Sequence, residues 1–140
     1  MPIRCEIISQ DRIVYQDDVD IVVVPGVEGV MGILPNHAPV LSLLQYGIIT
    51  VRKQGHEDYF TVAGGVVEVT GDQVTVLANA AENVDEINIQ RAEAARQRAE
   101  DRMKSIKGGK PEDLADLQAS LRRSNLRIAA VQRFRQKRTR

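Results

Sequence analysis

Short runs of alternating apolar and polar residues fill the first 84 positions of the 140-residue chain. Ile3, Cys5 and Ile7 alternate with polar residues, and β-branched residues dominate the run at 19–24. A period of two residues is typical of strands with one buried face. Further runs lie at 13–15, 48–52, 59–63, 66–69 and 74–78, with turn residues between them. The pattern predicts an antiparallel β-sandwich or barrel over residues 1–84, and we favour the sandwich.

The period changes to three and four residues after position 84. No proline or glycine interrupts residues 86–107, and one face of this segment carries Ala92, Ala95, Ala99, Met103 and Ile106. Pro111 suits the first position of a second helix. The apolar face of that helix contains Leu114, Leu117, Leu121, Ile128 and Val131, with Ser124 among them. The Gly108-Gly109 break predicts an antiparallel two-helix hairpin over residues 85–140.

The alanine face of the first helix buries little area. Because ordering a helix costs backbone entropy, we expect a hairpin that is loosely held and can change position at modest cost. The hairpin should therefore depend on a partner surface for much of its stability. A hairpin of this kind can serve as a two-state element.

Charge divides the chain at the same point. Residues 1–84 carry four basic and eleven acidic side chains, whereas residues 85–140 carry fifteen basic and eight acidic ones. The last twenty residues hold eight arginines and lysines and no acidic residue. Such a segment favours an anionic partner, which can be an acidic protein surface or nucleic acid, or it is a solvated helix end. Phe134 is the single aromatic residue of this segment, so stacking on single-stranded nucleic acid is poorly supported.

The sequence offers no set of residues for catalysis or metal binding. One cysteine and the two histidines, His37 and His56, are too few for a histidine or multi-cysteine zinc site. Cys5 fits a core position between two isoleucines. The glycines of residues 25–35 lack the Lys-Ser/Thr pair of a phosphate-binding loop. We also find no apolar run long enough for a membrane span and no secretory signal.

The segment LPNHAPV, residues 34–40, has two prolines around Asn36 and His37. Prolines restrict the backbone on both sides, so the loop should be stiff. It either presents a recognition surface or simply connects two strands.

Three segments resemble the epsilon subunit of bacterial F-type ATP synthases. They are residues 25–51, which contain GILPNHAP, residues 62–69, which read VAGGVVEV, and residues 74–87, which read VTVLANAAENVDEI. The resemblance covers residues 1–135. It implies a non-catalytic subunit of the central stalk, or rotor, whose β-sandwich links the gamma subunit to the c-ring for proton-driven ATP synthesis. It also implies that the hairpin can extend toward the alpha and beta subunits and then inhibits ATP hydrolysis.

The resemblance also implies site residues. Contacts with the gamma subunit and the c-ring fall on Gly29, Val30, Met31, Asn36 and His37. The inhibitory contact with the beta subunit falls on Arg122, Arg123, Arg127 and Arg133. The implied location is peripheral, on the cytoplasmic face of the bacterial plasma membrane, with membrane contact only through the c-ring and no nucleic acid partner.

Some members of this family bind regulatory ATP through a motif like I/L-D-x-x-R-A at the start of the first helix. Residues 87–92 read INIQRA, so Arg91 matches and Asn88 replaces the aspartate. An amide keeps an acceptor oxygen but lacks the charge. ATP binding at Asn88 and Arg91 is therefore open, and the resemblance implies no other cofactor and no metal.

Overall fold

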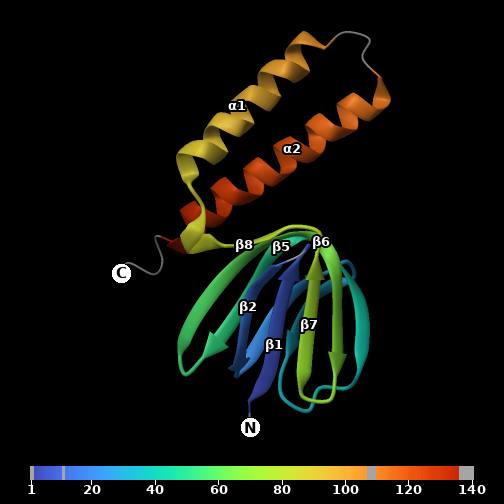
Figure 1. The fold of residues 1–140 in the computed structure, drawn as a ribbon, viewed down its shortest axis with the longest axis vertical. Coiled ribbons are helices and arrows are strands. Elements are labelled where there is room, and N and C mark those ends of the chain that lie inside the picture. The colour runs from blue at the N-terminus through green and yellow to red at the C-terminus, as the bar shows by residue number, and fades with distance from the viewer. Residues whose placement is uncertain (1, 11, 107–109, 136–140) are drawn as a thin grey trace. The chain divides into compact units, whose positions relative to one another are not determined.

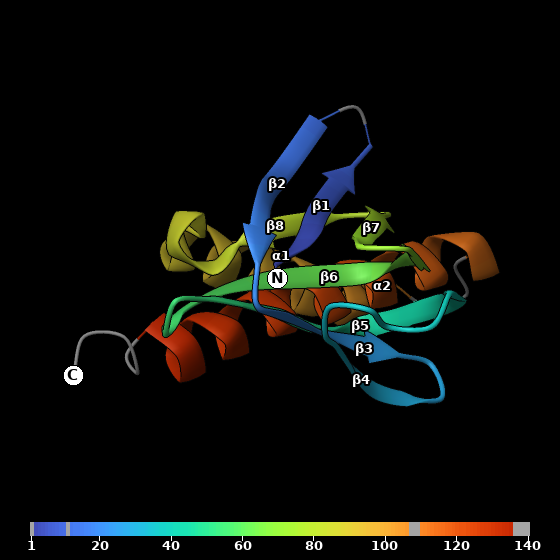
Figure 2. The ribbon, with the colours of Figure 1, turned by 90° about the horizontal axis from the view of Figure 1, so that it is seen from below.

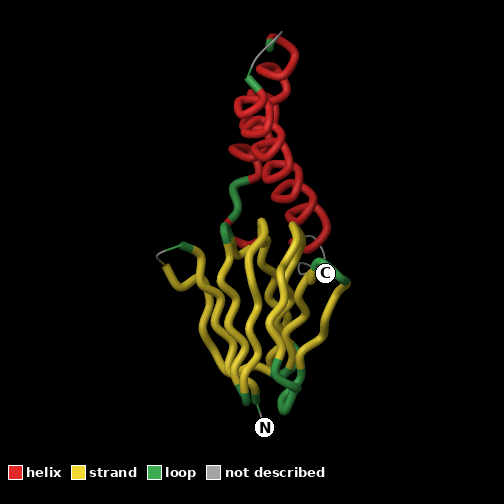
Figure 3. Tube along the Cα trace, turned by 90° about the vertical axis from the view of Figure 1, so that its right-hand side faces the viewer, coloured by secondary structure: helices red, strands yellow, loops and turns green. Residues whose placement is uncertain are grey.

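The computed structural model describes residues 2–10, 12–106 and 110–135 (Figure 1). The chain divides into two compact units, residues 1–84 and residues 85–140. The first unit consists of strands and the second of helices, which confirms the predicted β-sandwich followed by a helical hairpin (Figure 3). None of the helices among the described residues is long and apolar enough to span a membrane.

The β unit contains eight strands. Their bounds are β1(Ile3–Ser9), β2(Arg12–Val19), β3(Ile21–Gly26), β4(Gly29–Ile33), β5(Val40–Lys53), β6(His56–Thr70), β7(Gln73–Ala78) and β8(Ala81–Asn83). The strand order is β2-β1-β7-β6-β5-β3-β4, and β8 pairs with β6. In Figure 2, β6 lies between the group of β1, β2 and β7 and the group of β3, β4 and β5.

One strand pair differs from the antiparallel expectation. β1 pairs with β2 in antiparallel fashion but with β7 in parallel fashion, so the sheet is mixed. The direction of β1 is set by its hairpin with β2, and that of β7 by its hairpin with β6. Two hairpins that meet along a shared edge can pair in either sense. The alternation in the sequence identifies the strands but carries no information about this pairing.

The core of the β unit lies between the inward faces of the strands. Ile3, Cys5 and Ile7 have no exposed surface, as their alternation in β1 predicts. Phe60 is also fully buried and packs against the ring of Tyr15, with the ring centroids 5.2 Å apart. The prediction that Cys5 is a core side chain is therefore confirmed. Burial raises the pKa of its thiol to about 12, so the thiol is protonated at neutral pH.

β5 and β6 are the longest strands, and Gly64 and Gly65 lie inside β6 rather than between two strands. The N-terminal part of β6 pairs with β8, and the part from Gly65 onward pairs with β7. The glycines mark the point where β6 exchanges one neighbour for the other. Gly65 has φ +144°, and a Cβ placed there would lie 2.8 Å from Ala78 Cα. A side chain at this position would collide with the backbone of β7.

We expect Gly65→Ala to destabilise the protein by about 3 kcal/mol, because strain and steric overlap act together at this position. Gly32→Ala is the matched control. Gly32 has no positive φ and its nearest neighbour would be Ile21 Cδ1 at 3.7 Å, so we expect a change within about 0.5 kcal/mol. Urea denaturation followed by circular dichroism measures both. If both substitutions changed the free energy of unfolding equally, the contact between Gly65 and the backbone of β7 would not be as close as described.

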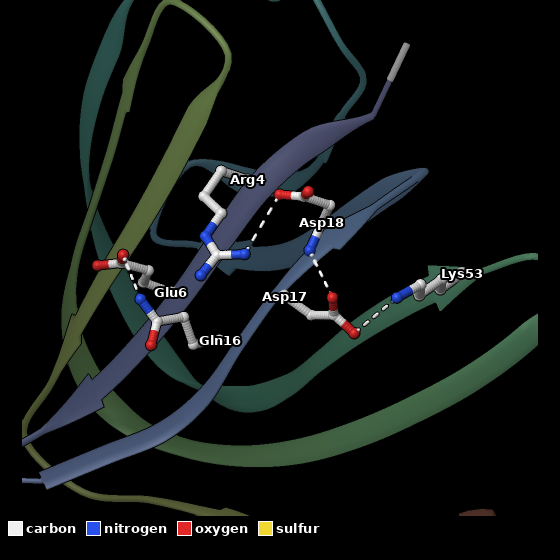
Figure 4. Close-up of polar contacts among 6 residues, drawn as sticks. All are labelled: Arg4, Glu6, Gln16, Asp17, Asp18 and Lys53. Carbon is white, nitrogen blue, oxygen red and sulfur yellow. Dashed lines mark hydrogen bonds and ion pairs between the residues drawn. The ribbon is translucent and has the colours of Figure 1, made fainter.

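A polar network connects β2 with β1 and β5 (Figure 4). Lys53 of β5 forms an ion pair with Asp17 of β2 at 2.9 Å, and Arg4 of β1 pairs with Asp18 at 3.3 Å. The hydrogen bond from Lys53, with a second from the Asp18 backbone N–H, lowers the pKa of the Asp17 carboxyl. This stabilisation is complete above the carboxyl's unfolded pKa and is lost as pH falls through the lowered folded value.

A single 3-10 turn, η1(Val84–Glu86), precedes α1(Ile89–Ser105). The predicted helix therefore starts three residues later than expected, because Asn88 is the N-cap and its side-chain oxygen accepts from Arg91 N at 3.1 Å. Pro111 is the first residue of α2(Pro111–Ala130), as predicted, and the π-helical η2(Val131–Arg135) follows. The predicted Gly108-Gly109 break lies outside the described residues.

The two helices run side by side in opposite directions (Figures 1 and 3). Ala92 and Ala99 of α1 are buried, as are Leu117 and Ile128 of α2. The predicted seam is confirmed except at Leu114, which is exposed. At the open end of the hairpin, the Arg135 guanidinium donates a hydrogen bond of 2.7 Å to the carbonyl of Ile87. This bond connects the segment before α1 to the end of η2.

Candidate interaction surfaces

An unbroken row of apolar side chains crosses the outer face of five strands. Each member is the registered partner of the next, from β2 through β1, β7 and β6 to β5. We call it the apolar row, and its members are Ile13, Ile8, Leu77, Val66 and Leu43. Single exposed apolar residues are ordinary on protein surfaces, but a contiguous set is typical of an interaction site.

Three members of the apolar row are strongly exposed: Ile13 is 57% exposed, Leu77 54% and Leu43 60%. Val27 continues the row beyond β5, since its N–H donates to the Leu43 carbonyl at 3.0 Å. Along β1, β5, β6 and β7, the neighbours of the row residues are buried or half-buried, so this face cannot turn inward without exposing them. The β unit thus presents a permanent apolar surface.

The five residues to which the resemblance assigns rotor contacts lie in two places. Gly29, Val30 and Met31 belong to β4, an edge strand, and Val30 is 73% exposed. Met31 is half-buried and packs against the core, so its side chain contributes to the fold. Asn36 and His37 lie in the loop between β4 and β5.

The loop that holds Asn36 and His37 is built around a tight turn. The N–H of His37 donates to the Leu34 carbonyl at 3.2 Å, and Asn36 has φ +65°. Proline followed by a residue with positive φ is the pattern of a type II turn, which Pro35 and Asn36 supply. Nδ1 of His37 lies 2.7 Å from the Ala38 carbonyl oxygen. A tight turn between two prolines fits the predicted stiff loop, and the His37 ring is held by a local hydrogen bond.

The basic residues of the hairpin do not form one surface. Arg122 and Arg123 are adjacent in α2, so their side chains leave the helix about 100° apart. Arg123 and Arg127 are one turn apart and share a face. Arg133 lies in η2, with its guanidinium 5.1 Å from the centroid of the Phe134 ring. The structure therefore brings Arg123 and Arg127 together and separates them from Arg122.

A groove between the two helices includes two arginines that the sequence reasoning missed. Its volume is about 230 Å³, and its lining is Ala95, Arg98, Ala99, Arg102, Leu117 and Ser120. Arg98 and Arg102 are one turn apart on α1, and among the described residues no carboxylate pairs with either guanidinium. Their spacing of four residues, next to the alanine face, could have indicated from the sequence that both arginines lie together beside this groove.

Asn88 and Arg91, the residues of the ATP motif, are held close together at the start of α1. The Asn88 side-chain oxygen already accepts the Arg91 backbone N–H as the helix cap. The carboxamide oxygen thus has a structural role independent of any ligand. Among the described residues, no group of three His, Cys, Asp or Glu is arranged to hold a metal ion.

A β-sandwich with an exposed apolar face, followed by a basic helical hairpin, defines a two-domain protein built for protein–protein contact. Residues 2–84 match the family described as ATP synthase, Delta/Epsilon chain, beta-sandwich domain, and residues 85–132 match the corresponding long alpha-helix domain. The chain belongs to the ATP synthase delta/epsilon chain family, and within it to the epsilon chains of the central stalk.

Bacterial relatives of this chain are ATP synthase epsilon chains. The ATP synthase epsilon chain of Herpetosiphon aurantiacus is 43% identical over 138 residues, which cover 97% of this chain and all of the relative. That of Pelotomaculum thermopropionicum is 49% identical over 100 residues, covering 71% of this chain and 75% of the relative. A chain in the Euglena gracilis mitochondrial ATP synthase has the same fold, with a TM-score of 0.76 at 24% identity, covering 93% of this chain and 81% of its own length.

Proposed function

We propose that the chain is a non-catalytic rotor subunit that binds the gamma subunit and the c-ring through its β unit and restrains ATP hydrolysis through its hairpin. The family membership supports a place in the ATP synthase, and the apolar row is the observation that supports stable docking there. The location that fits this role is peripheral, at the cytoplasmic face of the bacterial plasma membrane.

The apolar row supports docking because its size suits a permanent contact. Burying a leucine or isoleucine side chain contributes about 1.5 to 3 kcal/mol, and three members of the row are more than half exposed. β4, with Val30, and the stiff Pro35–Asn36 turn offer a second contact region near the end of the β unit. We assign the first surface to the gamma subunit and the second to the c-ring.

Co-purification tests this assignment. The tagged chain, expressed in its native host, should be recovered from solubilised membranes together with the catalytic and membrane subunits of the ATP synthase. The measurement is the ratio of this chain to the alpha and beta subunits in the purified complex. Recovery of the chain without any of these subunits would refute the proposal.

We further propose that the hairpin is the regulatory part. Its basic side chains complement acidic surfaces of the alpha and beta subunits, and Arg123 and Arg127 form the pair best placed for such a contact. The fully buried residues on the alanine face of α1 have small side chains. The free-energy cost of moving the hairpin from one position to another is therefore modest. Both properties suit an element that changes position and blocks rotation in the hydrolysis direction.

Regulatory ATP is a second proposal, supported by the groove at Arg98 and Arg102. Two guanidinium groups beside the hydroxyl of Ser120 offer donors for phosphate oxygens. Pockets that enclose a whole drug-sized ligand usually measure about 300 to 1,000 Å³, so a groove of about 230 Å³ suits the phosphates and leaves the base outside. The base would then lie toward Asn88 and Arg91, at the start of α1.

Calorimetric titration tests the ATP proposal. We expect ATP to bind in the millimolar range, and Arg98→Ala with Arg102→Ala to weaken binding by about tenfold, because two charge-assisted hydrogen bonds are lost. Arg96→Ala is the control, since Arg96 faces Glu100 at 3.9 Å and does not line the groove. Absence of binding to the unmodified chain at millimolar ATP would refute this proposal and leave the docking role untouched.

A further inference from the structure

The two flanks of the apolar row differ in charge. On one flank, the registered partners form a second row across the same five strands, two residues away along β1, β7, β6 and β5 and three residues away along β2, where the register shifts. Its members are Gln16, Glu6, Thr75, Glu68 and Leu41, and we call it the acidic flank. Successive side chains on one face of a strand are separated by about 7 Å. The acidic flank is therefore close enough for one bound segment to touch it and the apolar row together.

The opposite flank carries no charge at its described positions on β5, on β6 and directly after β7. It consists of Gln45, Gly64 and Asn79, and the Asn79 N–H donates to the Gly64 carbonyl at 3.0 Å. A Cβ at Gly64 would lie 3.0 Å from the Asn79 side-chain nitrogen, so the Asn79 amide covers this part of β6. We call this side the amide flank. The charge of the surface therefore changes across the apolar row, from acidic on one flank to neutral on the other.

Glu68 is the charge on the acidic flank that is open to a partner. Its side chain is exposed, and among the described residues no hydrogen bond or ion pair engages its carboxylate. Glu6 is half-buried and accepts a hydrogen bond from the Gln16 amide at 2.9 Å (Figure 4). The nearest basic side chain along β1, Arg4, is paired with Asp18. An incoming positive charge would therefore meet Glu68 without displacing an existing partner.

We propose that the apolar row binds a protein segment with an apolar ridge, lysine or arginine along one side and uncharged residues along the other. The inference rests on the proposed docking role and adds the chemistry and orientation of the partner. Five strands at about 4.8 Å spacing make the matching ridge about 19 Å long. The basic side lies over Glu68 and Glu6, and the uncharged side lies over the amide flank.

Charge on one flank fixes the direction in which the segment docks. A segment turned end for end would place its basic side over Gln45 and Asn79 and leave the carboxylate of Glu68 unpaired at the edge of the contact. Discrimination of this kind arises from the difference between the two arrangements, not from the apolar contact that both share. The acidic flank also disfavours an anionic membrane surface as the occupant of the row, because such a surface would be repelled by Glu68.

The test measures association of the full-length chain with the host's ATP synthase purified without this subunit, at low and high salt. We expect Glu68→Lys to slow association about tenfold at low salt, and much less at high salt, because charges at the edge of an interface act mainly on the association rate. Glu68→Gln should slow it less, in the same direction. Asp72→Lys is the matched control, since it makes the same charge change in the turn between β6 and β7, outside the three rows.

Equal association rates for Glu68→Lys and Asp72→Lys, with the unmodified chain binding well, would overturn this inference alone. If the unmodified chain did not bind the synthase at all, the docking role itself would be refuted. Binding of the unmodified chain to vesicles of anionic phospholipid, with Glu68→Lys binding no better, would also overturn the inference. Glu68→Gln keeps the test valid if the lysine variant folds poorly, as judged by circular dichroism.

Discussion

Leu43→Asp combined with Leu77→Asp is expected to remove the chain from the ATP synthase. Both leucines lie in the apolar row and are more than half exposed, so the substitutions leave the core of the β unit unchanged. In the complex, each would lose about 1.5 to 3 kcal/mol of burial and would place a carboxylate in an apolar contact. The apparent dissociation constant should rise at least about a hundredfold for the pair, which corresponds to about 2.7 kcal/mol. Co-purification from membranes measures the loss.

Leu114→Asp is the control for the double variant. Leu114 is also an exposed leucine, but it lies on α2, outside the apolar row. We expect this variant to co-purify with the synthase like the unmodified chain. Thermal denaturation should show that all variants fold. Normal recovery of the Leu43/Leu77 double variant would mean that the β unit docks through another surface.

Deletion of residues 85–140 is expected to raise ATP hydrolysis by the assembled synthase while the shortened chain stays bound. The β unit has its own buried core, so its fold does not require the helices. If the hairpin blocks hydrolysis with a coupling free energy of about 1 to 3 kcal/mol, its removal should raise the rate about fivefold or more. The rate of ATP hydrolysis, divided by the amount of alpha and beta subunits, is the quantity to measure.

The double substitution Arg123→Ala with Arg127→Ala is a milder test of the same inhibitory role. These two arginines share a face of α2, and their loss should release part of the inhibition without shortening the chain. Arg122→Ala, on a different face, should release less. An unchanged hydrolysis rate after deletion of the hairpin, with the β unit still present in the complex, would contradict the inhibitory role and leave the docking role standing.

Alternation along the chain predicted the strands that have one clearly buried face, but it predicted no strand at β4 or β8 and missed the first half of β5. β1 is the clearest case, with Ile3, Cys5 and Ile7 all inside. Alternation does not encode which strands become neighbours, so the parallel pairing of β1 with β7 was not predictable. In the sequence, Gly64-Gly65 separates the runs at 59–63 and 66–69, but whether it breaks a strand or lets one strand change neighbours depends on β7 and β8. Those contacts are long-range and leave no local signal.

The apolar row could not be predicted for the same reason. Ile13, Leu43 and Leu77 are far apart in the sequence, and each alone looks like an ordinary exposed apolar residue. Only the register of five strands brings them into one line. The Asn88 cap is local and was within reach of sequence reasoning, whereas the half-buried position of Met31 was not, because it depends on how β4 packs against the core.

Cys5 has no exposed surface, and the pKa of its thiol is raised to about 12. The thiolate is the form that attacks electrophilic thiol reagents, so this buried and protonated group is inert toward them at neutral pH while the β unit is folded. Cys5 is the one cysteine of the sequence, so a cysteine introduced on the surface would be the one reactive thiol of the variant chain. Maleimide labels or crosslinkers can be placed at one chosen position, and the native cysteine need not be removed to follow the chain within a working rotary complex.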